Sequence, residues 1–191
     1  KVYDCIANDL YFTNVQNMMI FPGNHDTARI GDVCQKDPAK MKIVYSLMAT
    51  LRGFPQIFAG DELMVTSRDL SQGHGGLRVE LPLDWAEDPV SKDLHDCFST
   101  LFQWRKTSDA VHNGATKHFI SRDNTYAYFR YTDSEAVFVY VNNNPSERAL
   151  PWDSYAEMMP HIKGKGHNVL TGEEFIPDGM TVPGKTSIVI E

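Results

Sequence analysis

Residues 18–29 read MMIFPGNHDTAR, a short apolar run followed at once by a dense group of polar side chains. The continuous apolar run over residues 18–21 is typical of a short strand that is buried on both faces. An amide, an imidazole, a carboxylate and a guanidinium then fall within six positions, at Asn24, His25, Asp26 and Arg29. In parallel α/β folds, catalytic residues lie at the carboxyl ends of the strands, so this segment is the first candidate site.

The sequence that follows predicts a second strand between two helices. Asp37 and Pro38 supply an N-cap and a first-turn proline for a helix that stops at Gly53. Residues 56–59, QIFA, form another short apolar run, and a second N-cap and proline begin a long helix that reaches about residue 105. Two strand–helix units in series indicate a parallel sheet or barrel.

The pattern changes near Ser108, beyond which short strands alternate with turns. We expect strands over residues 117–121, 125–131, 136–141, 168–170 and 186–190. This spacing suits an antiparallel sandwich. The sequence therefore predicts two domains, with strand–helix units of a parallel sheet or barrel in residues 1–108 and a β-sandwich in residues 109–191.

Composition narrows the classes of partner. The 191 residues carry a formal net charge of −7 and contain no basic run, which argues against binding to nucleic acid. No apolar stretch reaches 18 residues, so we expect no membrane partner. The three cysteines, Cys5, Cys34 and Cys97, are odd in number and far apart, which predicts free thiols and no zinc site.

A second segment of the sequence narrows the interpretation of residues 18–29. Residues 53–62 read GFPQIFAGDE, with a Gly-x-Pro opening and an aromatic-x-Gly-x-Glu close. Together with Asn24-His25-Asp26, this order resembles the last two strands of the catalytic barrel in the α-amylase family, glycoside hydrolase family 13. The loop over residues 78–85 is closest in pattern to neopullulanase- and cyclomaltodextrinase-like members. The resemblance implies the C-terminal strands and helices of a (β/α)8 barrel followed by an antiparallel β-sandwich.

The resemblance also implies roles for individual residues. Asp26 takes the place of the catalytic carboxylate that stabilises the oxocarbenium-like transition state, and His25 that of the imidazole bonded to the same sugar. Asn24 and Arg29 shape the loop, and Glu62 lines the mouth of the last strand, so these three join His25 as predicted substrate-binding residues. A structural hydrogen bond is an equal alternative for Glu62, as is a simple Asp26–Arg29 ion pair for the loop. The family has an acidic residue where this chain has Gly23.

Retaining glycosidases need a nucleophile and an acid/base, with carboxyl groups roughly 5–5.5 Å apart. The resemblance places both on earlier barrel strands, so we expect a C-terminal part that hydrolyses nothing alone. The implied substrates are starch, maltooligosaccharides, pullulan or cyclodextrins, and no cofactor or metal is implied. The expected partners are an α-glucan oligosaccharide and the remainder of the barrel, with a homo-oligomer possible through exposed barrel surfaces.

Two other interpretations stay open. Gly-Asn-His-Asp at residues 23–26 also resembles a ligand motif of metal-dependent phosphoesterases, although the further Asp and His ligands match poorly. The second alternative is a non-catalytic carbohydrate-binding module, because the C-terminal half holds several tyrosines and Trp152. Strand aromatics more often form core or cross-strand pairs, which is the simpler expectation.

Overall fold

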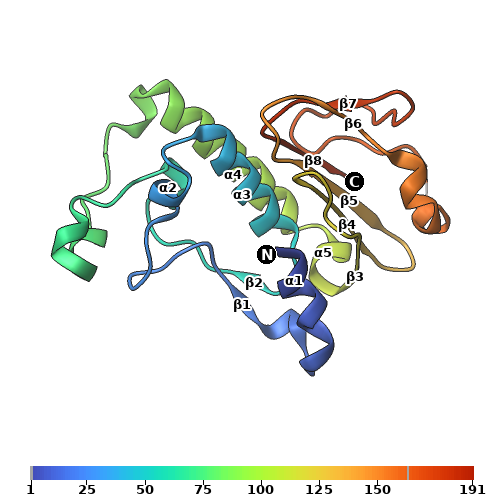
Figure 1. Ribbon diagram of the computed structural model, residues 1–191, viewed down its shortest axis with the longest axis horizontal. Coiled ribbons are helices and arrows are strands. Elements are labelled where there is room, and N and C mark those ends of the chain that lie inside the picture. The colour runs from blue at the N-terminus through green and yellow to red at the C-terminus, as the bar shows by residue number, and fades with distance from the viewer. Residues whose placement is uncertain (1, 163) are drawn as a thin grey trace.

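The computed structural model describes residues 2–162 and 164–191 (Figure 1). The α-helices are α1 (Val2–Ala7), α2 (Ile30–Val33), α3 (Pro38–Thr50), α4 (Pro89–Arg105) and α5 (Asp109–Asn113). The 3-10 helices are η1 (Asn8–Tyr11), η2 (Val15–Asn17), η3 (Asp61–Leu63), η4 (Leu70–Leu77), η5 (Trp85–Glu87) and η6 (Trp152–His161). The strands are β1 (Met19–Ile20), β2 (Phe54–Pro55), β3 (Ala115–His118), β4 (Thr125–Tyr131), β5 (Ala136–Asn142), β6 (Arg148–Ala149), β7 (Thr181–Val182) and β8 (Thr186–Ile190).

The first half contains the predicted strand–helix–strand unit. β1 and β2 pair in parallel, with Met19 opposite Phe54, and α3 lies between them in the chain. The Asp37 side chain accepts hydrogen bonds from the backbone N–H groups of Ala39 and Lys40, which is the predicted N-cap. The parallel pairing brings the residues after each strand to the same edge, which is where the candidate site lies.

The predicted strand over residues 56–59 is wrong in its position. The ladder ends where the Gln56 N–H donates to the Ile20 carbonyl, at 2.8 Å, because the segment that follows β1 bends away at Pro22. Strand burial also differs from the prediction, since Met19 is 47% exposed and Phe54 is 53% exposed. A two-stranded ladder buries neither strand on both faces, whatever the apolar pattern of its residues.

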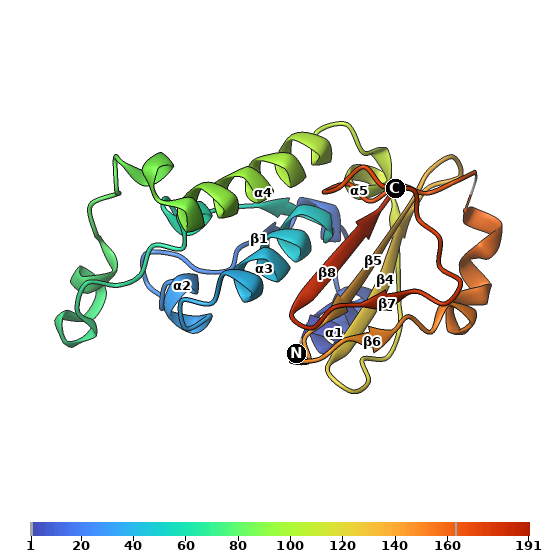
Figure 2. The ribbon, with the colours of Figure 1, turned by 90° about the horizontal axis from the view of Figure 1, so that it is seen from above.

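Helices α3 and α4 pack side by side, as Figure 2 shows. The Asp88 side chain accepts from the Ser91 N–H and caps α4, and Leu94 and Leu101 are fully buried against the neighbouring elements. Arg105, at the end of α4, donates to the carbonyls of Ala49, Leu51 and Gly53. The bonds to Ala49 and Leu51 satisfy carbonyl groups that the end of α3 would otherwise leave unpaired.

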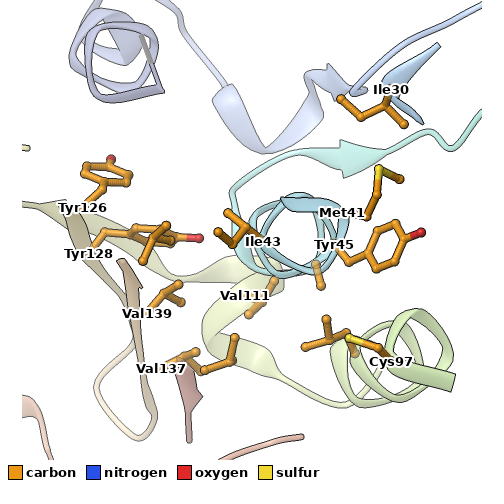
Figure 3. Close-up of a cluster of buried hydrophobic side chains, with 14 of the residues drawn as sticks. Ile30, Met41, Ile43, Tyr45, Cys97, Val111, Tyr126, Tyr128, Val137 and Val139 are labelled. Carbon is orange, nitrogen blue, oxygen red and sulfur yellow. The ribbon is translucent and has the colours of Figure 1, made fainter. Parts of the chain in front are cut away.

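The second half is built on a four-stranded antiparallel sheet of order β3-β4-β5-β8. Successive side chains of β4 point to opposite faces, so Tyr128 packs toward α3 while Phe129 packs toward η6. Figure 3 shows the core on the α3 side, where Tyr128, Val137 and Val139 meet the helices. The predicted antiparallel sheet is therefore confirmed, and its strand tyrosines are core residues.

One of the strands predicted for this half does not form. Instead of a strand over residues 168–170, the structure has only isolated bridges at His167 and Asn168. The outer layer of this sheet is formed by η6 and by the short antiparallel pair β6–β7. Pro160 lies inside η6, a position at which the sequence pattern gave no helical signal.

The helical layer and the sheet share one hydrophobic core, which runs from Ile30 through α3 to Val189. Polar contacts cross the same boundary, because Ser187 donates to Ser46 at 2.8 Å and the Tyr128 hydroxyl lies 2.5 Å from that of Thr50. The boundary between two domains at residue 108 therefore stays a prediction. Cys34 and Cys97 are buried free thiols, whereas the free thiol of Cys5 is exposed. No helix within the described residues could cross a membrane.

Candidate active site

The loop after β1 is held by its own side chains. The Asn24 side-chain oxygen Oδ1 accepts from the Asp26 N–H at 2.8 Å, and the Asn24 backbone N–H donates to the Thr27 hydroxyl at 2.9 Å. At Gly23 a Cβ atom would lie 3.2 Å from the Ala28 carbonyl oxygen, so the turn closes tightly on itself. Asn24 thus shapes the loop from within, and the position that is acidic in the family has little room for a side chain here.

His25 and Asp26 stand at the surface of this loop. Both side chains are 58% exposed, and His25 Nε2 lies 3.3 Å from Asp26 Oδ2. The other oxygen, Asp26 Oδ1, lies 3.0 Å from His74 Nδ1. The carboxylate is therefore flanked by two imidazoles, and the predicted alternative of an Asp26–Arg29 ion pair is wrong.

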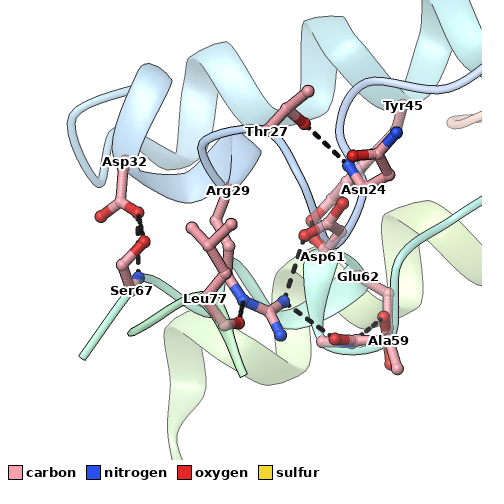
Figure 4. Close-up of polar contacts among 11 residues, drawn as sticks. Asn24, Thr27, Arg29, Asp32, Tyr45, Ala59, Asp61, Glu62, Ser67 and Leu77 are labelled. Atoms are coloured by element: carbon pink, nitrogen blue, oxygen red, sulfur yellow. Dashed lines mark hydrogen bonds and ion pairs between the residues drawn. The ribbon is translucent and has the colours of Figure 1, made fainter. Parts of the chain in front are cut away.

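Arg29 lies beneath the loop, with a side chain that is only 2% exposed. Its Nε donates to the Leu77 carbonyl at 2.9 Å, and its Nη1 donates to the Ala59 carbonyl at 2.9 Å (Figure 4). The guanidinium carbon also lies 4.2 Å from the centre of the Phe58 ring. Burial places Arg29 behind the site, where it ties the β1 loop to two later segments.

Asp61 is the ionic partner of Arg29, with Oδ1 3.4 Å from Nη1. Its side chain is 2% exposed, and its Oδ2 has no hydrogen-bond partner among the described residues. Burial raises the pKa of Asp61 to about 6, and the neighbouring Arg29 charge only partly opposes that rise. The Tyr45 hydroxyl holds the segment by donating to the Asp61 carbonyl at 2.8 Å.

Glu62 turns away from its neighbour, because its Oε2 accepts from the Gly60 N–H at 2.9 Å. This is the structural hydrogen bond that the sequence left as an alternative. Asp61 is buried and Glu62 is bonded to its own loop. The two adjacent carboxyl groups therefore do not face each other across one glycosidic bond as a nucleophile and an acid/base would.

The loop over residues 67–78 also contacts the β1 loop and was not predicted to belong to the site. The Ser67 N–H donates to the Asp32 carboxylate at 2.9 Å, and the Arg78 guanidinium donates to the His74 carbonyl at 2.6 Å. In Figures 1 and 2 this loop extends away from the sheet, on the same side as the β1 loop. His74 is not among the residues that the sequence singles out, and its only local signal is its place between Gly73 and Gly75.

The described residues contain no group of three or more His, Cys, Asp or Glu side chains placed to hold a metal ion. A family profile described as the α-amylase catalytic domain matches residues 2–144, and one described as the cyclomaltodextrinase C-terminal domain matches residues 116–191. The chain belongs to the α-amylase family. Because the match includes residues 23–26, the phosphoesterase interpretation is not favoured.

Individual relatives of the chain are also enzymes of the α-amylase family. The chain is 27% identical over 164 residues to a cyclomaltodextrinase of Geobacillus thermopakistaniensis, covering 84% of this chain and 26% of the relative. It is 31% identical over 130 residues to a cyclomaltodextrinase of a Bacillus species, covering 66% of this chain and 22% of that enzyme. The chain thus spans about a quarter of the curated relatives that it matches.

A solved structure confirms the fold of this α-amylase family chain. The α-amylase of Geobacillus thermoleovorans, complexed with acarbose, superposes with a TM-score of 0.73 at 17% identity. The superposition covers 99% of this chain and 42% of that enzyme. The arrangement of β1, α3, β2 and α4 beside an antiparallel sheet is therefore that of the end of an amylase barrel with its C-terminal domain.

Proposed function

We propose that this chain forms the transition-state-stabilising side of an α-glucan site in a retaining glycoside hydrolase. One observation carries the proposal, which is the placement of Asp26. Its carboxylate stands half-exposed at the carboxyl end of a parallel strand, within a loop that the α-amylase family match covers. A carboxylate in that position is open to sugar hydroxyl groups and close enough to stabilise positive charge that develops on a sugar ring.

His25 and Asp26 are the proposed sugar contacts. An ionised carboxylate has about four lone-pair positions, and the His74 imidazole uses one of them. The remaining positions can accept from two adjacent sugar hydroxyls, while the exposed His25 imidazole donates to a third group on the same ring. The implied ligand is an α-linked glucose oligosaccharide, from starch, pullulan or cyclodextrin.

For Asn24, Arg29 and Glu62 we propose positioning roles in place of the predicted substrate contacts. The Asn24 and Glu62 side chains accept from backbone N–H groups of their own loops. The guanidinium of Arg29 is buried among carbonyl oxygens. These bonds fix the shape of the floor and walls of the site, so their loss acts on Asp26 indirectly.

The chain alone is proposed to lack hydrolytic activity. A retaining mechanism needs a nucleophile and an acid/base on either side of one bond. The described contacts of Asp26 are with two imidazoles, and the nearby Asp61 is buried in an ion pair. We therefore propose that the two missing carboxylates come from the remainder of a barrel, the part that the relatives possess beyond the quarter matched here.

The test combines an activity assay with a binding assay. The 191-residue chain is expected to release no reducing sugar from starch, pullulan or cyclodextrin, yet to bind maltotriose by NMR titration. Asp26→Asn should weaken that binding roughly two- to tenfold, the worth of one or two hydrogen bonds. The control Asp153→Asn changes an exposed aspartate in η6, far along the chain, and should leave binding unchanged. Hydrolysis by the chain alone, or equal binding by both variants, would contradict the proposal.

A further inference from the structure

His74 contacts the proposed catalytic carboxylate from a distant part of the sequence. It lies in η4, 48 residues after Asp26, and its Nδ1 lies 3.0 Å from Asp26 Oδ1. Its ring is 63% exposed, so it stands beside Asp26 at the surface of the site. The contact is with the oxygen opposite the one that His25 approaches, so the two imidazoles flank the carboxylate.

The loop that carries His74 is closed by backbone contacts. A Cβ atom at Gly76 would lie 1.9 Å from the Asp69 carbonyl oxygen, so the two ends of the loop meet at backbone contact distance. The Arg68 N–H donates to the Gly76 carbonyl at 2.9 Å across the same closure. Leu77 is 4% exposed, and its carbonyl accepts from Arg29. The position of His74 is therefore fixed at its base by backbone contacts and by the buried arginine.

We propose that His74 is a positioning residue that orients the Asp26 carboxylate for the transition state. The proposal rests on the function proposed above for Asp26. An ionised carboxylate can only accept hydrogen bonds, so His74 Nδ1 must carry the proton in this contact. The bond fixes the rotation of the carboxylate plane while leaving its other lone pairs to the sugar.

The proton on Nδ1 has a second consequence. The nitrogen that bears the proton in a neutral imidazole is set by the hydrogen bonds of the ring, and here Nδ1 is the donor. His74 Nε2 is then the acceptor nitrogen of the exposed ring, and only Nδ1 acts on Asp26. The 67–78 loop thereby becomes part of the α-glucan site, and its conformation controls the orientation of Asp26.

The first experiment reads the tautomer of His74 directly. Imidazole ¹⁵N spectra of the 191-residue chain are recorded near pH 9, where an ordinary histidine, with a pKa of about 6.5, is neutral. We expect His74 as the Nδ1–H tautomer in the wild type and a shift toward Nε2–H in Asp26→Asn. His112, an exposed histidine of α5, serves as the internal control and should not change. An Nε2–H tautomer for His74 in the wild type would overturn the inference.

The second experiment reads the consequence for sugar binding. In His74→Asn the amide nitrogen replaces Nδ1 as a donor, whereas His74→Ala removes the donor. We expect the affinity for maltotriose to fall roughly two- to tenfold in His74→Ala and to recover within about twofold in His74→Asn. Equal losses in both variants would overturn a positioning role, and His112→Ala should have no effect.

The two failures are distinguishable. If maltotriose does not bind the wild type at all while the Nδ1–H tautomer is present and depends on Asp26, the proposed function fails and the His74–Asp26 contact stands. If maltotriose binds through Asp26 but the tautomer is Nε2–H, the proposed function stands and the inference about His74 fails. Thermal melts that match the wild type exclude misfolding as the cause of either result.

Discussion

At the scale of single residues, the pair of Arg29 and Asp61 fixes the floor of the site. The pair joins the loop after β1 to the segment after β2, and both side chains are 2% exposed. One oxygen of Asp61 has no hydrogen-bond partner among the described residues, so burial of the charge is only partly offset. The free energy of unfolding therefore depends on whether Asp61 is protonated.

That dependence gives a prediction for Asp61→Asn. The pKa of Asp61 is about 6 in the folded chain against an ordinary 3.8, so the folded state holds its proton to higher pH. The resulting stabilisation is fully present below about pH 4 and is lost as the pH rises through 6. Relative to Asp61→Asn, the wild type should lose on the order of 3 kcal/mol of unfolding free energy across this window.

Urea denaturation at several pH values measures the difference between the two proteins, in which other titrating groups cancel. Asp37→Asn, which removes the N-cap carboxylate of α3, is a control for a general charge effect. A difference that is flat with pH, or that grows in favour of the wild type as the pH rises, would contradict the assigned direction of the shift.

Residue patterns in the sequence identified the loop that carries the candidate site but not the buried contacts beneath it. Asn24, His25 and Asp26 are consecutive, so their shared loop could be read from the order of residues alone. The partners of Arg29 and Asp26 lie 32 and 48 residues further on, at Asp61 and His74. Such contacts depend on how the later loops fold back, which local sequence does not encode.

At the scale of elements, the 67–78 loop decides the geometry of one wall. Its closure depends on Gly76, whose Cα faces the Asp69 backbone, whereas nothing lies within 4 Å of a Cβ built at Gly75. The loop also contacts the β1 segment at two points, through the His74 ring beside Asp26 and through the Leu77 carbonyl that accepts from Arg29.

Adjacent glycines therefore give a matched pair of variants. Gly76→Ala should open the loop and cost about 1–3 kcal/mol of stability, because an added methyl group has no space to occupy. Gly75→Ala should be close to neutral. Hydrogen exchange at the Arg68 amide, which donates to the Gly76 carbonyl, reports the opening directly. Equal protection in both variants would show that the closure does not hold the loop.

Elements also show why strand prediction succeeded at residues 125–131 and failed at residues 56–59. The predicted strand at residues 125–131 and the observed β4 (Thr125–Tyr131) coincide, because β4 pairs along its whole length with β5 and over residues 128–131 with β3. The apolar run at residues 56–59 forms no strand, since β1 offers it no neighbour beyond Ile20. Strand residues need a partner at the right register, and hydrophobicity alone does not supply one.

At the scale of the whole molecule, helices and sheet are joined by one core, but the β1–β2 side is uncovered. Met19, Phe21 and Phe54 are between 41% and 53% exposed at this side. Within the described residues, β1 and β2 form a two-stranded sheet with no third strand. Unpaired strand edges beside exposed apolar side chains favour association with another chain.

We therefore predict that the 191-residue chain self-associates in a concentration-dependent way. Phe54→Lys should weaken the association at least about tenfold, since burial of a Phe side chain is worth roughly 1.5–3 kcal/mol. Ile176→Lys is the matched control, because Ile176 is 65% exposed and lies in the C-terminal half. Light scattering over a concentration series measures the mass. A monomer at all concentrations, or equal effects of both variants, would contradict the prediction.

The central claim is that Asp26 contacts an α-glucan, and a crystal structure of the chain with maltotriose tests it most directly. The account predicts one sugar ring between His25 and His74, with a hydroxyl within hydrogen-bonding distance of an Asp26 carboxylate oxygen. A sugar bound instead to the aromatic side chains around Trp152, with the Asp26 loop empty, would contradict the account and favour a carbohydrate-binding module.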